Sequence, residues 1–289
     1  FGVVVINSYV YFDEQGYQGN NLVFRTLYFN ILFLAINISS GIIAYQQNYS
    51  GRQNYALAKI TQKETEKARN VLNYLFPKFI APQVLKNEEL IAENQSSVTI
   101  VFCNICEFHE IVESFSPQEL TAFLDLVFRK FDRLCKLHGV SKIETVGYTY
   151  MACSGITHSE KELEIGLKSV PQARRAVNLA VAMLKEAEGI FWMFNKPLKL
   201  KIGVNTGSVT AGVVGYQKPQ FALVGDTVNT SSRMASTLEY ENAIQISDAT
   251  YQDLGDYSSL QFEVKEVEVK GKGKMKTFIV YESSSSRIN

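Results

Sequence analysis

The sequence has little of several features that mark common classes of protein. Its 289 residues include 29 basic and 29 acidic side chains, so the net charge is zero, and there is no basic stripe of the kind that binds nucleic acid. The GxxxxGK[ST] phosphate loop is absent. The four cysteines, at positions 103, 106, 135 and 153, contain one CxxC pair without the second pair that a zinc site needs. We therefore expect no nucleic-acid partner and no zinc centre, and we expect buried, reduced thiols in a cytosolic setting.

The longest stretch without charge lies near the N-terminus, at residues 26–45 (TLYFNILFLAINISSGIIAY). Twenty residues of helix are about the length that crosses the apolar part of a bilayer. Asp13 and Glu14 precede the stretch. Five basic residues follow it, namely Arg52, Lys59, Lys63, Lys67 and Arg69. By the positive-inside rule we predict a membrane segment over 1–45, a transmembrane helix at 26–45 and a cytoplasmic remainder. The alternative is a buried helix of a soluble protein.

The sequence begins without methionine and without the layout of a signal peptide. This favours a piece of a longer polytopic membrane protein. Residues 46–92 are predicted to form a helical linker, in which Leu57 and Ile60 begin an apolar face. The polar stretch 61–67 interrupts that face, so a broken coiled coil and a solvated stalk helix are supported equally. Pro77 is expected to end the helix.

Strand and helix patterns alternate over residues 93–284. Short apolar runs bounded by turn residues predict strands, and apolar residues at helical spacing predict helices. The predicted strands cover 97–105, 141–147, 149–155, 198–207 and 208–215, and the predicted helices begin at 117 and 171. The first helix opens with a capping box from Ser116 to Glu119. Because the second and third strands, and likewise the last two, are predicted to pair as hairpins, we expect an α/β (α+β) domain with a ferredoxin-like core, followed by a tail at 285–289.

Two sequence strings concentrate side chains that suit a polyphosphate. The string GDTVNTSSRM places Asn229 and Arg233 four residues apart, hence on one face of a helix. The string VKGKGKMKTF places Lys270 and Lys272 between glycines, which let backbone approach a ligand closely. A guanidinium with ammonium groups matches the oxygens of a polyphosphate. Asp226, beside the helix start, is predicted to cap the helix rather than to bind a metal.

Together these strings resemble the class III nucleotidyl cyclases, the adenylyl and guanylyl cyclases, over about residues 93–283. The resemblance implies the cyclase fold and the conversion of a nucleoside triphosphate to a cyclic nucleotide and pyrophosphate with Mg²⁺ or Mn²⁺. It also implies roles for four residues. Asn229 would position the ribose and Arg233 would stabilise charge in the transition state, whereas Lys270 and Lys272 would bind phosphate.

The two metal-binding aspartates of that family are missing. The family has an aspartate in F-x-D-I-x-x-F, where this sequence reads FCNICEF with Asn104. It has a second in G-D-x-Y-M, where this sequence reads GYTYM with Tyr148. An amide and a phenol cannot replace two carboxylates around Mg²⁺, which requires hard anionic oxygens. We therefore predict no metal site in this chain, with the metal bound mainly by a partner domain, elsewhere in the same polypeptide, that carries both aspartates.

Glu144 is the predicted base-reading residue. In the family, this place in K-I-x-T-[VI]-G holds lysine in adenylyl cyclases and glutamate in guanylyl cyclases. A carboxylate accepts hydrogen bonds from the adjacent donors of guanine, and adenine has no such pair. Ala222 occupies the second base-reading place, where guanylyl cyclases usually have a small polar residue and adenylyl cyclases an aspartate. Alanine contacts the base without bonding it, so it weakens the discrimination. Glu144 therefore carries the preference for GTP, and ATP stays an alternative.

Two hypotheses follow. In the first, the chain is the complementary half of a heterodimeric membrane guanylyl cyclase that converts GTP to cyclic GMP, or of an adenylyl cyclase that uses ATP. In the second, it is an inactive pseudocyclase that dimerises and regulates. The missing residues are all metal ligands, whereas the complementary set is present together. Random loss of active-site residues would not be restricted to the metal ligands, so the first hypothesis is favoured.

Overall fold

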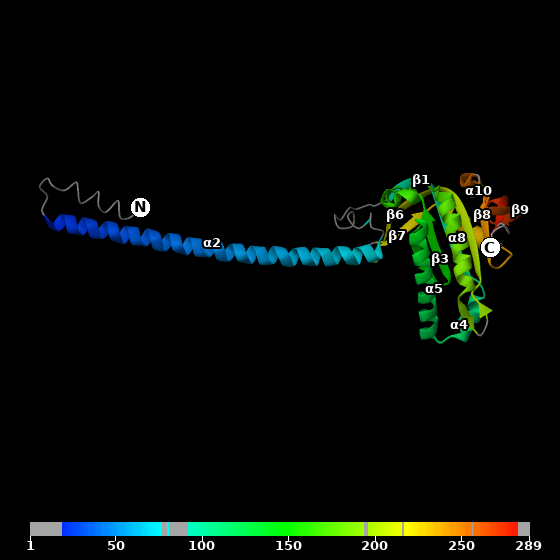
Figure 1. Cartoon of the computed structure of the whole chain (residues 1–289), viewed down its shortest axis with the longest axis horizontal. Coiled ribbons are helices and arrows are strands. Elements are labelled where there is room, and N and C mark those ends of the chain that lie inside the picture. Colours follow the sequence, from blue (N-terminus) through cyan, green and yellow to red (C-terminus); the bar gives the residue numbers. More distant parts are fainter. Residues whose placement is uncertain are drawn as a thin grey trace. The chain divides into compact units, whose positions relative to one another are not determined.

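The structure is a computed structural model that describes residues 19–76, 80, 92–193, 196–215, 217–255 and 257–282 (Figure 1). The chain divides into two units, Phe1–Val71 and Leu72–Asn289. Three parts of the predicted organisation lie outside the described residues: the first 18 residues of the membrane segment, residues 77–79 and 81–91 at the end of the linker, and the C-terminal tail. The sheet and the helices that pack on it belong to the second unit.

A long helix, α2 (Gly19–Leu75), begins in the first unit. Between Phe24 and Leu72 it includes a stretch that is long and apolar enough to cross a membrane, and none of that stretch is buried. Large side chains such as Leu34 and Ile38 are more than half exposed. The predicted transmembrane helix at 26–45 therefore lies within a longer helix, which continues without a break into the predicted linker.

The linker part of α2 exposes both charged and apolar side chains. Lys67 Nζ lies 2.7 Å from Glu64 Oε1, at a spacing that places two helical side chains side by side. Leu57 and Ile60 are exposed, so the coiled coil and the solvated stalk both stay predictions. The helix ends two residues before Pro77, because proline excludes the helical conformation from the residue that precedes it.

In the second unit, eight strands form one sheet in the order β2-β3-β1-β6-β8-β10-β9, with β7 paired to β6. The strands are β1 (Ala92–Ile105), β2 (Ser141–Val146), β3 (Thr149–Ser154), β6 (Leu200–Val214), β7 (Gln220–Val224), β8 (Ala243–Ser247), β9 (Leu260–Val269) and β10 (Gly273–Glu282). A small separate pair is formed by β4 (Phe191–Met193) and β5 (Lys196–Pro197). Of the pairs within the large sheet that the structure describes, only β6 with β8 is parallel.

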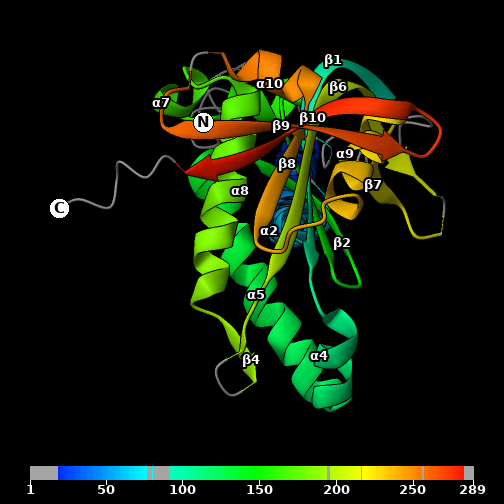
Figure 2. The same ribbon diagram turned by 90° about the vertical axis from the view of Figure 1, so that its right-hand side faces the viewer.

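Helices cover both faces of this sheet. The helices of this unit are α4 (Phe108–Ser114), α5 (Pro117–His138), α6 (Thr157–Glu162), α7 (Ile165–Lys168), α8 (Gln172–Glu188), α9 (Asp226–Ser236) and α10 (Asp248–Leu254). Of these, α5, α8, α9 and α10 pack against the strands. Figure 2 shows α8 and α9 on either side of the strands. The arrangement is the predicted mixed α/β architecture, in which the central strands β1 and β6 are covered on both faces.

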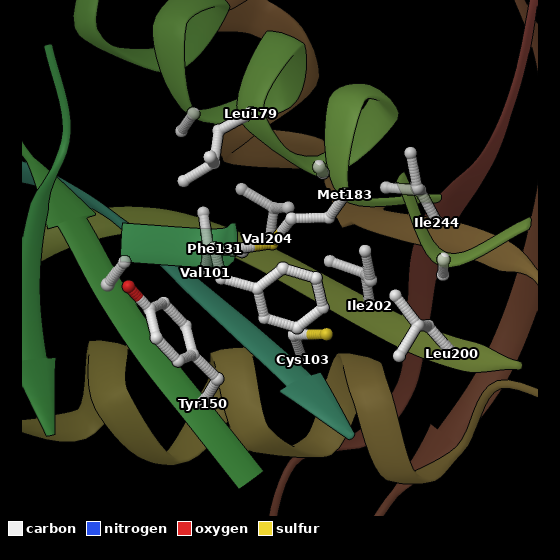
Figure 3. Close-up of a cluster of buried hydrophobic side chains, with 14 of the residues drawn as sticks. Val101, Cys103, Phe131, Tyr150, Leu179, Met183, Leu200, Ile202, Val204 and Ile244 are labelled. Atoms are coloured by element: carbon white, nitrogen blue, oxygen red, sulfur yellow. The ribbon is translucent and has the colours of Figure 1, made fainter. Parts of the chain in front are cut away.

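The period of two along β1 divides its side chains between two clusters. Val101 and Cys103 are buried with α5 and α8 in the larger cluster, and Val98 and Ile100 are buried in a second cluster on the other face. Figure 3 shows side chains of α8 and of β6 converging in the larger cluster. Full burial of one large apolar side chain such as Phe131 stabilises the fold by about 1.5–3 kcal/mol.

Helix α5 confirms the predicted capping box. The Ser116 hydroxyl accepts a hydrogen bond from the Glu119 amide, and the Glu119 carboxylate accepts one from the Ser116 amide at 2.9 Å. Each bond satisfies an amide that the first helical turn leaves without a partner. The buried face of the helix consists of Phe123, Val127, Phe131 and Cys135. The hairpin between β2 and β3 is also confirmed, with Gly147 in the left-handed conformation at φ 58°.

The predicted hairpin between 198–207 and 208–215 is wrong. Both stretches belong to the single strand β6, which pairs with β1 from Leu200 to Gly212. Gly207 lies opposite Val98, where the register of the two strands shifts, and glycine is common at such bulges. Gly207 makes room for the side chain of Thr227 and does not turn the chain.

Candidate active site

Helix α9 carries Asn229 and Arg233 on its exposed side. It approaches β6 closely because glycine leaves room for it. A Cβ atom at Gly203 would lie 2.1 Å from the amide nitrogen of Ala235 and 2.5 Å from the carbonyl oxygen of Ser231. Real Cβ atoms do not approach backbone so closely, so any larger residue at this position would displace the helix.

Hydrogen bonds fix the buried side of α9 to the sheet. The Ser231 hydroxyl donates to the carbonyl oxygen of Ile100 at 3.3 Å. The Asn205 amide donates to the carbonyl oxygen of Thr227 at 3.1 Å, and the Thr227 hydroxyl donates to that of Ser208 at 2.7 Å. These contacts determine which side of the helix faces away from the sheet.

The outward side of α9 is free to meet a ligand. In the part of the chain that the structure describes, the side chains of Asn229 and Arg233 have neither a hydrogen-bond nor an ion-pair partner. The predicted shared face of these two residues is therefore confirmed. An amide that both donates and accepts, next to a guanidinium with five donors, suits a sugar hydroxyl beside a phosphate.

Asp226 does not cap α9, and that prediction is wrong. The N-cap residue is Gly225, with φ 151°, and no side chain caps the helix. Asp226 is instead the first residue of the helix, and its carboxylate forms an ion pair with the Lys272 ammonium. The sequence could not reveal this contact, because the two residues are 46 positions apart.

Lys270 and Lys272 lie in the turn between β9 and β10, as predicted. Gly271 and Gly273 have φ values of 84° and 71°, which glycine adopts without strain. The Lys272 amide donates to the carbonyl oxygen of Val269 at 2.9 Å and closes the turn. Both lysines are exposed as residues, although the Lys272 side chain is itself partly covered. The structure thus brings Lys272 to the start of α9, whereas Lys270 forms no ion pair among the described residues.

The two base-reading positions lie on β2 and β7. Glu144 is exposed on β2, at the edge of the sheet, and follows a bulge in its pairing with β3. Ala222 is half-buried in β7. Glu144 lines the same large groove as Gln220 and Phe221, the two residues before Ala222. Within the described residues, no hydrogen bond or ion pair joins Glu144 to the face of α9.

A polar network that sequence reasoning missed supports β2. The Tyr150 hydroxyl donates to Asp132 Oδ1 at 2.7 Å, and Lys142 Nζ lies 3.0 Å from the same oxygen. Burial raises the pKa of Tyr150 above its ordinary value, so the phenol stays a hydrogen-bond donor. Lys142 is two residues before Glu144, so this network restrains the strand that carries Glu144. In the sequence, only Lys142 of this network lies within the K-I-E-T-V string that marks the predicted base-reading residue.

Asn104 and Tyr148, the positions of the missing aspartates, come together at the end of β1. The Ile105 amide donates to the carbonyl oxygen of Tyr148 at 3.1 Å. The Asn104 amide oxygen accepts a hydrogen bond from the Thr149 hydroxyl at 2.8 Å, and the ring of Tyr148 lies 5.2 Å from that of Phe108. These neutral, internally engaged groups do not fit a pair of divalent cations.

Nearby carboxylates do not replace the missing ligands. Glu107 has a left-handed backbone, with φ 52°, and its carboxylate lies 3.4 Å from Lys199 Nζ. The same ammonium lies 2.7 Å from Glu241. Among the described residues, no three side chains of histidine, cysteine, aspartate or glutamate are grouped to hold a metal ion.

The cysteines are packing residues, as expected. Cys103 and Cys153 are fully buried, and burial raises the pKa of each thiol above its ordinary value. Burial also raises the pKa of Cys135 to about 12 and that of the half-buried Cys106 to about 11. None of these thiols is a thiolate near neutral pH, so none is an activated nucleophile.

Comparison with known proteins identifies the domain. Residues 90–282 match the model of a family described as the adenylate and guanylate cyclase catalytic domain. The chain belongs to this family. The class III cyclase resemblance and the predicted cyclase fold are thereby confirmed.

Several relatives of known sequence are named guanylate cyclases. The chain is 27% identical to the guanylate cyclase of Toxoplasma gondii, over 86% of the chain and 8% of that protein. It is 33% identical to human guanylate cyclase soluble subunit beta-2, over 78% of the chain and 35% of that protein. It is also 33% identical to human atrial natriuretic peptide receptor 2, over 84% and 23%. The chain thus spans about a third or less of the length of these relatives.

Solved cyclase structures have the same fold. The guanylate cyclase domain of RhGC from Catenaria anguillulae, in complex with GTP, is 35% identical with a TM-score of 0.58, covering 66% of this chain and 100% of that domain. The catalytic core of a rhodopsin-guanylyl cyclase with converted specificity, in complex with ATPαS, is 36% identical with a TM-score of 0.58, covering 66% and 98%.

Proposed function

We propose that this chain is the complementary half of a heterodimeric membrane guanylyl cyclase that converts GTP to cyclic GMP and pyrophosphate. The observation that carries the proposal is the unpaired outward face of α9, where Asn229 and Arg233 stand ready for a ligand and Lys272 is held nearby. The positions of the metal ligands, Asn104 and Tyr148, are neutral and engaged internally. A cyclase domain with both aspartates, elsewhere in the same polypeptide, would complete the site.

The residues of this chain bind and orient the nucleotide. In the reaction, the ribose 3′ oxygen attacks the α-phosphorus and pyrophosphate leaves. The Asn229 amide, which can donate and accept, would hold the ribose so that its 3′ oxygen faces the phosphorus. The Arg233 guanidinium would bind the α-phosphate oxygens, on which negative charge increases in the transition state. Lys270 and Lys272 would bind the leaving pyrophosphate.

Mg²⁺ or Mn²⁺ would activate the attacking oxygen and neutralise the phosphates when bound by the partner's two aspartates. At positions 104 and 148 this chain has an amide and a phenol in place of carboxylates, so its proposed contribution is binding and charge stabilisation.

Glu144 supports GTP as the substrate. Its carboxylate is exposed on the edge strand β2, where the ring N–H and the exocyclic amine of guanine can both donate to it. A site of this kind discriminates strongly against an analogue without those donors. The relative solved with ATPαS is a guanylyl cyclase of converted specificity, so ATP stays the alternative substrate for this chain.

Helix α2 supports a membrane location. Its apolar stretch would anchor the protein, and the basic residues that follow would keep the cyclase domain on the cytoplasmic side. We assign residues 1–45 to the membrane segment, 46–92 to the linker and 93–284 to the cyclase domain.

A regulatory pseudocyclase is the second candidate, favoured by the internal contacts of Asn104 and Tyr148. The experiment that separates the two candidates compares the chain alone with the chain co-expressed with a cyclase domain that carries both aspartates. Cyclic GMP formation from GTP is measured with Mg²⁺ and with Mn²⁺. We expect no activity from the chain alone and activity from the assembly.

A restoration variant sharpens this experiment. With Asn104→Asp and Tyr148→Asp together, two copies of the chain would contain every required group, so the chain alone should form cyclic GMP. Each single substitution is the matched control and should stay inactive, because both carboxylates are needed. Robust activity of the unmodified chain alone would contradict the complementary-half proposal. An assembly without activity, together with an inactive double variant, would favour the pseudocyclase.

A further inference from the structure

The contact between Asp226 and Lys272 connects two parts of the candidate site. Asp226 is 73% exposed and Lys272 is 31% exposed, so water competes for both charges and the pair adds little to stability. Neither charge needs the other as a partner, because water could solvate each side chain if the ion pair were absent. The ion pair therefore matters because it sets the position of the Lys272 ammonium, and it contributes little to the stability of the fold.

Asp226 begins a stripe along α9. Asp226, Asn229 and Arg233 are separated by three and then four residues, so they lie on one face of the helix. All three are exposed. At 1.5 Å per residue, the stripe extends about 10 Å along the helix axis. An ammonium bound to Asp226 is thus held at one end of the row that contains the proposed ribose and α-phosphate contacts.

Among the described residues, Asp226 is the ion-pair partner of the Lys272 side chain. A Cβ atom built at Gly271 or at Gly273 would meet nothing within 4 Å, so the flanking positions are open. The lysine side chain has four rotatable bonds and would lose their entropy on binding a phosphate. A carboxylate that already holds the ammonium removes part of that loss. Since an ammonium has three donors, two N–H groups remain for phosphate oxygens.

We propose that Asp226 is a positioning residue, which holds the Lys272 ammonium at the N-terminal end of the Asn229–Arg233 row, ready for the terminal phosphates of the nucleotide. The inference rests on the proposed cyclase function and adds to it a residue that does not touch the substrate itself. Lys270, two residues away in the same turn, forms no ion pair among the described residues and provides an internal comparison.

The test uses the full chain assembled with its aspartate-bearing partner domain. Steady-state kcat and KM for GTP, and inhibition by pyrophosphate and by cyclic GMP, are measured for Asp226→Asn, Asp226→Glu, Lys272→Met and the Asp226→Asn/Lys272→Met double variant. Asp226→Asn should raise KM for GTP and the inhibition constant of pyrophosphate about threefold to tenfold. The inhibition constant of cyclic GMP, which lacks the terminal phosphates, should stay within about twofold of the wild-type value. Asp226→Glu should restore most of the loss.

Double-mutant cycles identify the route of the effect. If Asp226 acts through Lys272, the double variant should be no worse than Lys272→Met alone, so the cycle is strongly non-additive. The matched cycle of Asp226→Asn with Lys270→Met should be additive, because no contact joins those residues.

Three outcomes would overturn the inference. Additive effects of Asp226→Asn and Lys272→Met would separate the two residues. A fall in KM on Asp226→Asn would mean that the carboxylate competes with phosphate for the lysine. Equal changes for pyrophosphate and cyclic GMP would point to a general disturbance of α9. A wild-type assembly that forms no cyclic GMP would instead overturn the proposed function, and this inference with it.

Discussion

Two regions of the cyclase domain, the end of β1 and the helix α9, carry the two sets of positions that define a class III cyclase site, and they differ in what their side chains do. At the end of β1, Asn104 accepts a hydrogen bond from Thr149, and Tyr148 packs against Phe108. On α9, Asn229 and Arg233 face outward without partners among the described residues. The polar groups of the first region are paired within the chain, whereas those of the second are exposed to solvent.

The difference has a physical basis. A half-buried amide such as that of Asn104 needs a hydrogen-bond partner, since an unsatisfied buried polar group costs about 1–3 kcal/mol. An exposed arginine has no such requirement, because water solvates it. The half-buried Asn104 is therefore paired within the chain, whereas the exposed α9 side chains can stay unpaired. The following predictions test whether the two regions differ in function as they do in contacts.

The largest effect is expected from Arg233→Ala in the assembled enzyme. Removal of a charge-stabilising group that acts mainly in the transition state should lower kcat more than it raises KM. We expect kcat to fall by about tenfold to a thousandfold, which is comparable with the loss of one oxyanion-hole donor. Steady-state kinetics with GTP measures both constants.

Asn104→Ala is the matched control from the other region. Its side chain bonds to Thr149 within the chain, so its removal should leave kcat within about threefold of the wild-type value, a change of less than 0.7 kcal/mol. Similar losses for Arg233→Ala and Asn104→Ala would break the comparison between the two regions.

An intermediate effect is expected from Gly203→Ala, which acts on the position of α9. The added Cβ would lie 2.1 Å from the backbone nitrogen of Ala235. We expect the free energy of unfolding to fall by about 3 kcal/mol, at the upper end of the usual cost of overpacking, together with loss of activity.

Gly166→Ala provides the control for that substitution, because a Cβ at Gly166 meets nothing within 4 Å. Chemical denaturation of the two variants compares their stabilities. If Gly203→Ala is as stable as Gly166→Ala, the close approach of α9 to β6 is not what sets the orientation of its outward face.

The smallest effect is expected from a change of specificity with Glu144→Lys and Ala222→Asp. Lysine can donate to a ring nitrogen of adenine, and the new aspartate can accept from its amine. Guanine would lose its acceptor at position 144 and leave two donors unpaired. The ratio of kcat/KM for ATP to that for GTP should rise at least about tenfold, since 1.4 kcal/mol corresponds to one decade. Competition between the two nucleotides measures the ratio, and an unchanged ratio with surviving activity would remove the support for GTP.

Much of the fold could be predicted because its determinants are local. The capping box at Ser116 contains both of its partners within four residues, and the turn at Gly147 depends on a conformation that glycine adopts easily. The end of α2 depends on Pro77 nearby. The spacing of Asn229 and Arg233 is a property of any helix, so their common face followed from the sequence as soon as a helix was expected there.

The predictions that failed depended on distant contacts. Gly207 and Ser208 have the composition of a turn, yet they continue a strand because β1 pairs on both sides of them and Thr227 lies against the glycine. Asp226 has the composition of a helix cap, yet its carboxylate binds Lys272. In both cases a local preference of about 1 kcal/mol or less was outweighed by tertiary contacts.

The sequence by itself therefore determined which chemical groups this protein has, which it lacks, and how they are spaced along each helix and turn. It determined the family, because the strings that carry the resemblance are continuous. Only the tertiary structure decided which of these groups meet. The β9–β10 turn places Lys272 beside α9, and Tyr150, Asp132 and Lys142 form a network that supports the strand of Glu144. Asn104 and Tyr148 contact neighbouring side chains of the same chain. The physical reason is that such contacts join residues far apart in the chain, which strand pairing and close packing bring together.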